Sequence, residues 1–110
     1  MSLYLQRSGS RENPGLVLLH GWGMHSDIWQ SWLPSLEQHF EVICIDLPGL
    51  GQSADCFPSD YSLETVAAMV VNRLDSEHAA GIPESLTWLG WSLGGLIAVQ
   101  IATDYPRRVA

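Results

Sequence analysis

The chain has 110 residues, of which 46% are hydrophobic, so it is long and apolar enough to fold as one packed domain. The chain has 12 acidic residues, five arginines and no lysine, so its net charge is −7. This charge argues against nucleic acid or an anionic membrane surface as a partner, and it is of a size that keeps a small domain soluble.

Cysteine usage and the N-terminal sequence bear on the cellular compartment. Cys44 and Cys56 are too few for a disulfide framework, and we expect both to be reduced thiols. Residues 1–13 have no basic stretch followed by the apolar run of a signal peptide, and no apolar run in the chain approaches the ~20 residues of a membrane span. We therefore expect a cytoplasmic protein that does not bind membranes.

The first half of the chain begins with two predicted strands. Residues 4–6 predict a small antiparallel strand, and residues 16–19 form an apolar run between turn signals, which is typical of a strand buried on both faces. Residues 26–36 then predict a helix capped by Ser26 and Asp27, with one apolar side. Pro34 indicates that this helix is short or bent. Its apolar side consists of Ile28, Trp29, Trp32 and Leu36.

The middle of the chain repeats the order of strand, loop and helix. Residues 40–45 predict a second buried strand, which leads into the turn-rich segment DLPGLGQS at residues 46–53. Residues 62–74 then predict a helix, because Ser62 can cap it and apolar residues follow at helical spacing.

The last third of the chain supplies one more strand and one more helix. Residues 85–89 predict a third buried strand, and residues 93–104 predict an apolar helix that ends before Pro106. Alternation of strands and helices is typical of an α/β fold, with a mostly parallel sheet and right-handed crossover helices.

The stretch LGWSLGG at residues 89–95 contains the strongest chemical signal. Ser92 lies between Gly90 and Gly94, where a buried strand passes into a helix, which is the setting of a nucleophile elbow. The alternatives are a serine that only caps the helix, or a loop that cradles phosphate. The patterns GxGxxG and GxxxxGK[ST] are both absent, so nucleotide binding is weakly supported.

A serine nucleophile also needs donors for the oxyanion of the tetrahedral intermediate. One donor normally comes from the residue after the nucleophile, here the amide of Leu93, beside the positive end of the helix dipole. The other must come from a nearby loop, and the glycines of HGWG at residues 20–23 suit that task. Both segments follow strands at their carboxyl ends, where open α/β sheets bind ligands.

Three motifs, LLHGWG at residues 18–23, DLPGLGQS at 46–53 and LGWSLGG at 89–95, resemble those of the α/β-hydrolase fold family in order and spacing. The resemblance extends over residues 1–110, which would be the N-terminal part of one α/β-hydrolase domain. The combination of HGWG with GWSLGG is most similar to serine carboxylesterases that hydrolyse a pimeloyl-acyl-carrier-protein methyl ester in biotin biosynthesis.

The resemblance implies roles for three positions and needs neither metal nor cofactor. Ser92 would be the nucleophile, the backbone amides of Trp22 and Leu93 would form the oxyanion hole, and Trp22 would also line the substrate pocket. It further implies that the strands before Trp22 and Ser92 are neighbours, so that their loops face one crevice.

Other polar and aromatic residues are given structural roles. We expect His20 to shape the oxyanion loop rather than to act as the base, and Asp46 to tie down the turn at Pro48 and Gly49. The remaining histidines are expected to be exposed to solvent or to have their ring nitrogens hydrogen-bonded within the fold; they are His25, His39 and His78. The tryptophans are expected to lie mostly in the core or the pocket lining; they are Trp22, Trp29, Trp32, Trp88 and Trp91.

The partners of Ser92 are missing from the expected part of the chain. In this family an Asp or Glu and then a His follow the nucleophile, but only Asp104 and no histidine follow Gly95. We therefore expect the front part of a longer protein, incomplete at its C-terminus and inactive alone. The strand at residues 86–89 would then be an exposed edge through which copies could form an oligomer.

Two alternative functions share these motifs. Another α/β-hydrolase, such as a lipase, a thioesterase or a carbon-carbon hydrolase, would carry nearly all of them, and so would a non-catalytic binding module of the same fold. A carrier-protein partner, itself acidic in general, would not be attracted by the charge of this chain. A basic docking surface would have to lie downstream or locally, near Arg107 and Arg108.

Overall fold

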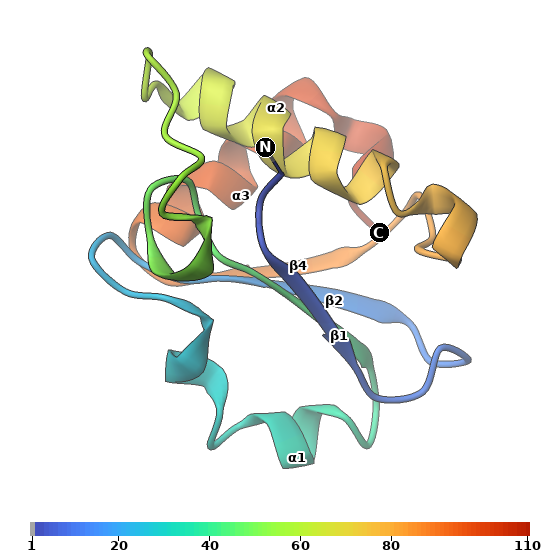
Figure 1. The fold of residues 1–110 in the computed structure, drawn as a ribbon. Coiled ribbons are helices and arrows are strands. Elements are labelled where there is room, and N and C mark those ends of the chain that lie inside the picture. Colours follow the sequence, from blue (N-terminus) through green and yellow to red (C-terminus); the bar gives the residue numbers. More distant parts are fainter. Residues whose placement is uncertain (1) are drawn as a thin grey trace.

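The computed structural model describes residues 2–110 and contains one four-stranded sheet. Its strands lie in the order β1-β3-β2-β4, with β1 antiparallel to β3 and the other neighbours parallel (Figure 1). The α/β fold with a mostly parallel sheet is therefore confirmed, and so is the antiparallel strand at the front of the chain. The strands are β1 (Leu5–Ser8), β2 (Gly15–Leu19), β3 (Glu41–Ile45) and β4 (Thr87–Gly90).

The central strands are buried along their whole length. Every residue of β2 and β3 is buried, because structure covers both faces of the sheet. Their apolar runs predict this burial, and the charged Glu41 at the start of β3 is buried in an ion pair with Arg7. The prediction of a third buried strand is wrong in this structure. In β4, Thr87 is exposed and the other residues are only partly buried, since within residues 2–110 this strand pairs with β2 alone and forms an edge of the sheet.

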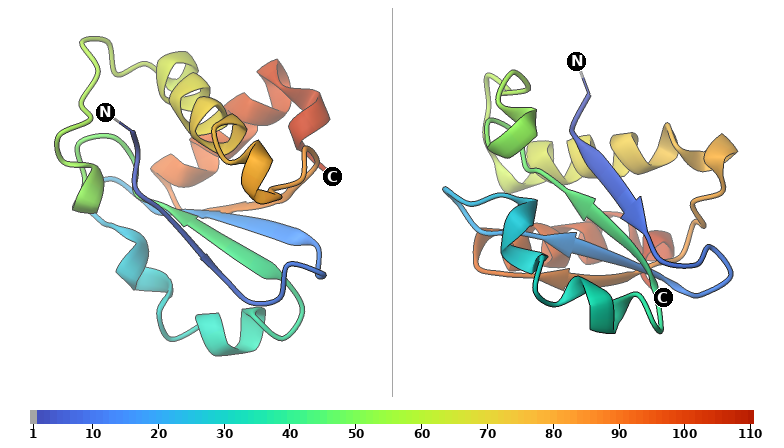
Figure 2. Two further views of the ribbon diagram at one scale, coloured as in Figure 1. Left: turned by 45° about the vertical axis from the view of Figure 1, so that its right-hand side comes forward. Right: turned by 60° about the horizontal axis from the view of Figure 1, so that its bottom comes forward.

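The helices lie on the two faces of the sheet. Figures 1 and 2 show α2 (Leu63–Asp75) and α3 (Leu93–Asp104) on one face and the short α1 (Leu33–Leu36) on the other. None of the helices within residues 2–110 is long and apolar enough to cross a membrane. Short 3-10 turns complete the fold: η1 (Ser26–Trp29), η2 (Gly51–Ser53), η3 (His78–Ala80) and η4 (Pro106–Arg108).

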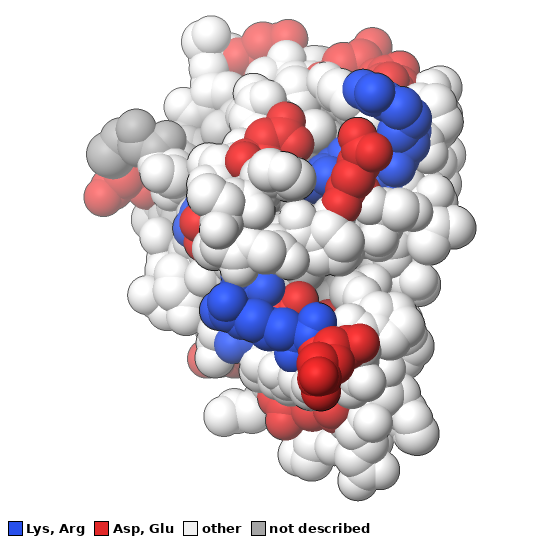
Figure 3. All heavy atoms as spheres, turned by 90° about the vertical axis from the view of Figure 1, so that its right-hand side faces the viewer, with Lys and Arg blue, Asp and Glu red and all other residues white. Residues whose placement is uncertain are grey.

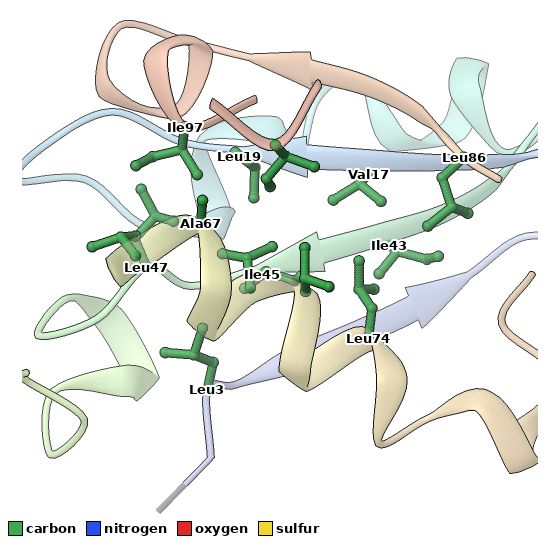
Figure 4. Close-up of a cluster of buried hydrophobic side chains, with 14 of the residues drawn as sticks. Leu3, Val17, Leu19, Ile43, Ile45, Leu47, Ala67, Leu74, Leu86 and Ile97 are labelled. Carbon is green, nitrogen blue, oxygen red and sulfur yellow. The ribbon is translucent and has the colours of Figure 1, made fainter. Parts of the chain in front are cut away.

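Helix α2 begins and packs as its sequence predicts. The Ser62 hydroxyl accepts a hydrogen bond from the Thr65 backbone N–H at 3.1 Å and so caps the helix. The apolar side of α2 lies against the sheet in the main core, where Leu74 and Ala67 approach Ile43, Ile45 and other strand residues (Figure 4). This core places α2 and α3 firmly above the strands whose ends carry the motifs.

The prediction of one helix over residues 26–36 is wrong. The segment forms η1 and α1 instead, and the cap of η1 is His25, whose Nδ1 accepts from the Asp27 N–H at 3.4 Å. Pro34 lies in the first turn of α1, where its missing N–H costs nothing, so a helix starts there rather than passing through. Trp29 is buried as expected, but Ile28 and Trp32 are exposed.

Candidate active site

Ser92 occupies a strained turn between β4 and α3. Its backbone has φ 54° and ψ −114°, and it is the one non-glycine residue with positive φ among residues 2–110. Such a conformation costs on the order of 1–3 kcal/mol and persists only where the surroundings enforce it. The side chain is exposed and makes no capping hydrogen bond to α3. Capping of the helix therefore does not explain this serine.

Two glycines let strand and helix approach closely around this turn. A Cβ added to Gly90 would lie 2.3 Å from the backbone carbon of Gly94. A Cβ added to Gly94 would lie 2.0 Å from the carbonyl oxygen of Leu19 in β2. No side chain fits at either position, so both glycines are required by the packing of backbone on backbone.

The loop after β2 lies directly beside Ser92. The Trp91 N–H donates to the Leu19 carbonyl at 2.9 Å, which joins the ends of β4 and β2. A Cβ on Gly21 would lie 3.0 Å from the Trp91 ring and 3.4 Å from the Ser92 Cβ, so the loop backbone reaches the serine without an intervening side chain. The strands before Trp22 and Ser92 are neighbours, as the resemblance implied.

The backbone N–H groups of Trp22 and Leu93 have no acceptor within residues 2–110. Their neighbours differ, because Met24 N–H donates to the Gly21 carbonyl at 3.2 Å and Gly94 N–H donates to the Trp91 carbonyl at 3.0 Å. Leu93 is also the first residue of α3, where the helix dipole is positive. One unpaired donor thus lies in the loop beside the exposed serine and the other directly follows the serine in sequence, and backbone donors of this kind can stabilise a developing negative charge.

His20 is fully buried and bonded to the backbone through both ring nitrogens. Its Nε2 accepts from the Leu47 N–H at 2.9 Å, so Nδ1 carries the proton and donates to the Gly21 carbonyl at 2.8 Å. Burial lowers the pKa of His20 below its usual value, which keeps the ring neutral. The side chain supports the loop backbone, in agreement with the structural role expected for it.

The other histidines are exposed, and no hydrogen bond in the part of the chain that the structure describes joins a histidine to Ser92. They are His25, His39 and His78. A general base for the serine is therefore not found among residues 2–110.

Asp46 joins the segment that follows it to a second loop next to the site. Its buried carboxylate accepts from the Ser26 N–H at 2.8 Å and from the Gln52 N–H at 2.9 Å. The bond from Gln52 closes the segment that contains Pro48 and Gly49, as expected for Asp46, and the bond from Ser26 is an additional contact that was not predicted. Ser26 is far from Asp46 in sequence, so no local pattern reveals this partner.

Most tryptophans are more exposed than predicted. Only Trp29 is buried and Trp88 partly so, whereas Trp22, Trp32 and Trp91 have 59%, 52% and 57% of their surface exposed. The predicted placement in the core or pocket lining fails for Trp32, which lies beside α1. Trp22 and Trp91 lie at the open surface around Ser92.

Two aromatic residues near the site were not predicted from the sequence. Tyr61 meets the Trp22 ring edge-on, with the ring centroids 5.4 Å apart, and Phe57 lies 5.1 Å from Tyr61. Both come from the irregular segment between η2 and α2, and a loop of this kind carries no pattern that assigns its aromatic side chains to a neighbour.

Within residues 2–110 no three His, Cys, Asp or Glu side chains lie close enough together to hold a metal ion. Cys44 and Cys56 are free thiols. Burial raises the pKa of Cys44 to about 11, so this thiol remains protonated and unreactive.

Comparison with known proteins agrees with this geometry. The family model described as the alpha/beta hydrolase fold matches residues 14–110. The chain is 43% identical over its full length to the pimeloyl-[acyl-carrier protein] methyl ester esterase of Vibrio campbellii and 44% identical to that of Vibrio parahaemolyticus. In both cases it spans 39% of the relative's length.

A solved structure shows the same arrangement of elements. The crystal structure of a hydrolase from Pseudomonas aeruginosa PA01 superposes with a TM-score of 0.87 at 30% sequence identity. The match covers 97% of this chain and 38% of that hydrolase. The chain therefore corresponds to about two fifths of its relatives in both sequence and structure.

Proposed function

The chain belongs to the α/β-hydrolase fold family, and on that premise we propose that the full-length protein is a serine carboxylesterase that hydrolyses a pimeloyl-acyl-carrier-protein methyl ester in biotin biosynthesis. By full-length protein we mean the natural polypeptide that carries these residues. The observation that carries the proposal is the strained, exposed Ser92, with unpaired backbone amides at Leu93 and in the adjoining loop at Trp22, in a chain 43% identical to an esterase of that name.

In the proposed reaction Ser92 Oγ attacks the carbonyl carbon of the methyl ester. Its proton passes to a general base, and the N–H groups of Trp22 and Leu93 stabilise the oxyanion. The intermediate collapses with loss of methanol, which takes the proton from the base, and leaves an acyl-enzyme on Ser92. Water, activated by the same base, then releases the free carboxylic acid. The chemistry calls for no cofactor.

The base and the carboxylate that orients it belong to residues outside this chain in our proposal. Residues 1–110 would form the N-terminal part of a single α/β-hydrolase domain. Two observations support this: the chain spans 39% of the length of its esterase relatives, and no histidine bonds to Ser92 within residues 2–110. Cytoplasmic location fits the two free thiols and an intracellular carrier-bound substrate.

Docking of an acidic carrier protein would need a basic surface, either outside these residues or locally near Arg107 and Arg108. Each arginine lies within 4.0 Å of a carboxylate, and Figure 3 shows arginines in contact with acidic side chains on the face it presents. Arg107 and Arg108, which we considered for docking, are paired as well. The pairs are Arg7 and Arg11 with Glu41, Arg73 with Glu77, Arg107 with Glu84, and Arg108 with Asp75.

Labelling with a fluorophosphonate tests the proposal in the full-length protein. We expect covalent labelling of Ser92 and methanol release from a pimeloyl methyl ester, with both lost in Ser92→Ala. Labelling without release of methanol from this ester would identify another hydrolase of the family, such as a lipase or thioesterase. A folded protein that is not labelled would instead fit a non-catalytic binding module.

A further inference from the structure

Three aromatic rings form a continuous surface that starts next to Ser92. We call this surface the aromatic wall; it consists of Trp22, Tyr61 and Phe57. Tyr61 is the middle ring, with centroid distances of 5.4 Å to Trp22 and 5.1 Å to Phe57. The Trp22 and Tyr61 planes are perpendicular, and those of Tyr61 and Phe57 are inclined at 40°, which are favourable geometries for aromatic pairs.

The segment that follows β3 holds the wall in place. The Tyr61 hydroxyl donates to the Pro48 carbonyl at 2.9 Å, and burial raises the pKa of Tyr61, so the donor keeps its proton. The Phe57 ring lies directly on Gly49, where an added Cβ would come within 2.4 Å of the ring. Gly49 has φ 79°, a backbone conformation that favours glycine, and its missing side chain leaves room for the Phe57 ring. Tyr61 is thus anchored by its hydroxyl, and Phe57 packs on the turn that accepts this hydrogen bond.

The wall lies at the same edge of the sheet as the serine. Trp22 follows β2, Phe57 and Tyr61 follow β3, and Ser92 follows β4. The carboxyl ends of these parallel strands meet at one edge, where such sheets bind ligands. Gly21 directly precedes Trp22, and a Cβ added to Gly21 would lie 3.4 Å from the Cβ of Ser92. The loop that carries Trp22 and the turn that carries Ser92 thus lie side by side.

Two rings of the wall are largely exposed. Trp22 and Phe57 have 59% and 60% of their surface exposed, although each contacts Tyr61. Contiguous apolar area at a protein surface usually marks a binding site. Aromatic faces bind methylene groups well, because the ring face buries hydrocarbon and has no polar atom that would lose a hydrogen bond to water.

We propose that the aromatic wall binds the hydrocarbon part of the acyl group, and that Phe57 and Tyr61 set the preferred chain length. This inference rests on the proposed function, because the acyl group is placed by its bond to Ser92. The series of ring contacts begins at Trp22, in the loop beside the serine, and passes through Tyr61 to Phe57. Short acyl groups would reach only Trp22, whereas chains of the length of a pimeloyl group would reach Tyr61 and Phe57.

The test compares p-nitrophenyl esters from acetate to octanoate on the full-length protein. In Phe57→Ala we expect kcat/KM for octanoate to fall about tenfold and that for acetate to change less than about twofold. Tyr61→Ala should lower the octanoate value at least as far, because it removes the ring that joins the other two. Tyr61→Phe keeps the ring and should preserve most of the chain-length preference.

Trp32→Ala is the matched control, since this ring is exposed to 52% but lies beside α1, away from the wall. It should leave the whole series unchanged, and acetate hydrolysis reports that each variant is folded. Equal losses on acetate and octanoate in Phe57→Ala, or the same profile in Trp32→Ala, would overturn the inference. A folded wild-type protein that hydrolyses none of the esters and is not labelled at Ser92 would overturn the proposed function itself.

Discussion

At the residue scale, the geometry of Ser92 differs from that of an ordinary helix cap. A capping serine has extended backbone and bonds to the first helical amides, as Ser62 does at φ −83° and ψ 160°. Ser92 has φ 54° and ψ −114° and leaves those amides free. The hydroxyl is thus held out of the helix at an energetic cost that capping would not require.

A substitution that relieves the backbone strain at Ser92 should raise the free energy of unfolding. Glycine adopts the φ and ψ of Ser92 without a steric penalty, so Ser92→Gly should increase the free energy of unfolding by about 1–2 kcal/mol relative to Ser92→Ala. Both variants lack the hydroxyl and should be equally inactive. Urea denaturation of the full-length protein measures the difference, and equal stability of the two variants would contradict a strained backbone at this position.

His20 makes the stability of the protein depend on pH. Its pKa is lowered in the folded state by burial, so the unfolded chain takes up a proton first as the pH falls through the usual value of 6.5. Stability should therefore be unaffected well above that pH and decrease below it, by at most about 1.4 kcal/mol per pH unit for one proton. We expect His20→Gln to lose this component.

The measurement is the free energy of unfolding at intervals from about pH 7.5 to about pH 5.5, above the range in which ordinary carboxylates titrate. His78→Gln is the control, because His78 is exposed. Its pH profile should follow the wild type. A His20→Gln profile as steep as the wild type would contradict the role of His20 burial.

Sequence alone could predict residues whose role depends on near neighbours or on a shared motif. Ser92 and His20 belong to this group, and the structure places both where the motifs indicate. Asp46 does not, since its partner Ser26 is brought to it only by the completed fold. The same holds for Phe57 and Tyr61, whose neighbours Gly49 and Trp22 lie on separate segments.

At the element scale, prediction succeeded where one local rule decides the structure. Helix α3 spans Leu93–Asp104 as expected, and α2 starts after its Ser62 cap. Residues 26–36 failed because apolar spacing suggested one continuous helix, whereas Pro34 and the demand to bury Trp29 divide the segment. Exposure of Ile28 and Trp32 follows from that division.

The packing of α3 on β2 depends on Gly94, and its neighbour provides a matched control. Gly94→Ala puts a Cβ 2.0 Å from the Leu19 carbonyl oxygen, so α3 must shift, and we expect a loss of about 3 kcal/mol of stability. In Gly95→Ala the nearest atom is 3.4 Å away, and stability should change by less than about 1 kcal/mol.

Thermal or urea denaturation of the full-length variants distinguishes the two glycines. Because the shift of α3 also moves Leu93, Gly94→Ala should reduce fluorophosphonate labelling of Ser92 in molecules that remain folded. Similar stability of the two variants would show that α3 does not need the close approach to β2.

At the scale of the whole molecule, two apolar features remain open in residues 2–110. Strand β4 pairs with β2 alone. Leu86, the residue just before β4, forms an isolated parallel bridge with Val109. On α3, Leu96 and Val99 are exposed to 56% and 66%. An unpaired strand edge beside exposed apolar side chains favours association, in keeping with the oligomer that we infer for the isolated residues.

A polypeptide of residues 1–110 should therefore sediment as a concentration-dependent oligomer. The double variant Leu96→Lys and Val99→Lys adds two charges to the outer side of α3 and should shift the population toward monomer. Ile28→Lys, on the opposite face of the sheet, is the control and should not. Circular dichroism establishes that each sample is folded, and a folded monomer at all concentrations would contradict the prediction.

The contact between Gly94 and Leu19 also bears on the order of events during folding. It joins residues 75 positions apart and supports the turn that holds Ser92. Contacts of such long sequence separation form late, once loop closure has been paid for by neighbouring structure. We therefore expect Ser92 to reach its strained conformation during synthesis only after β2, β4 and α3 have assembled. In nascent or partly folded chains the backbone at this serine should be relaxed.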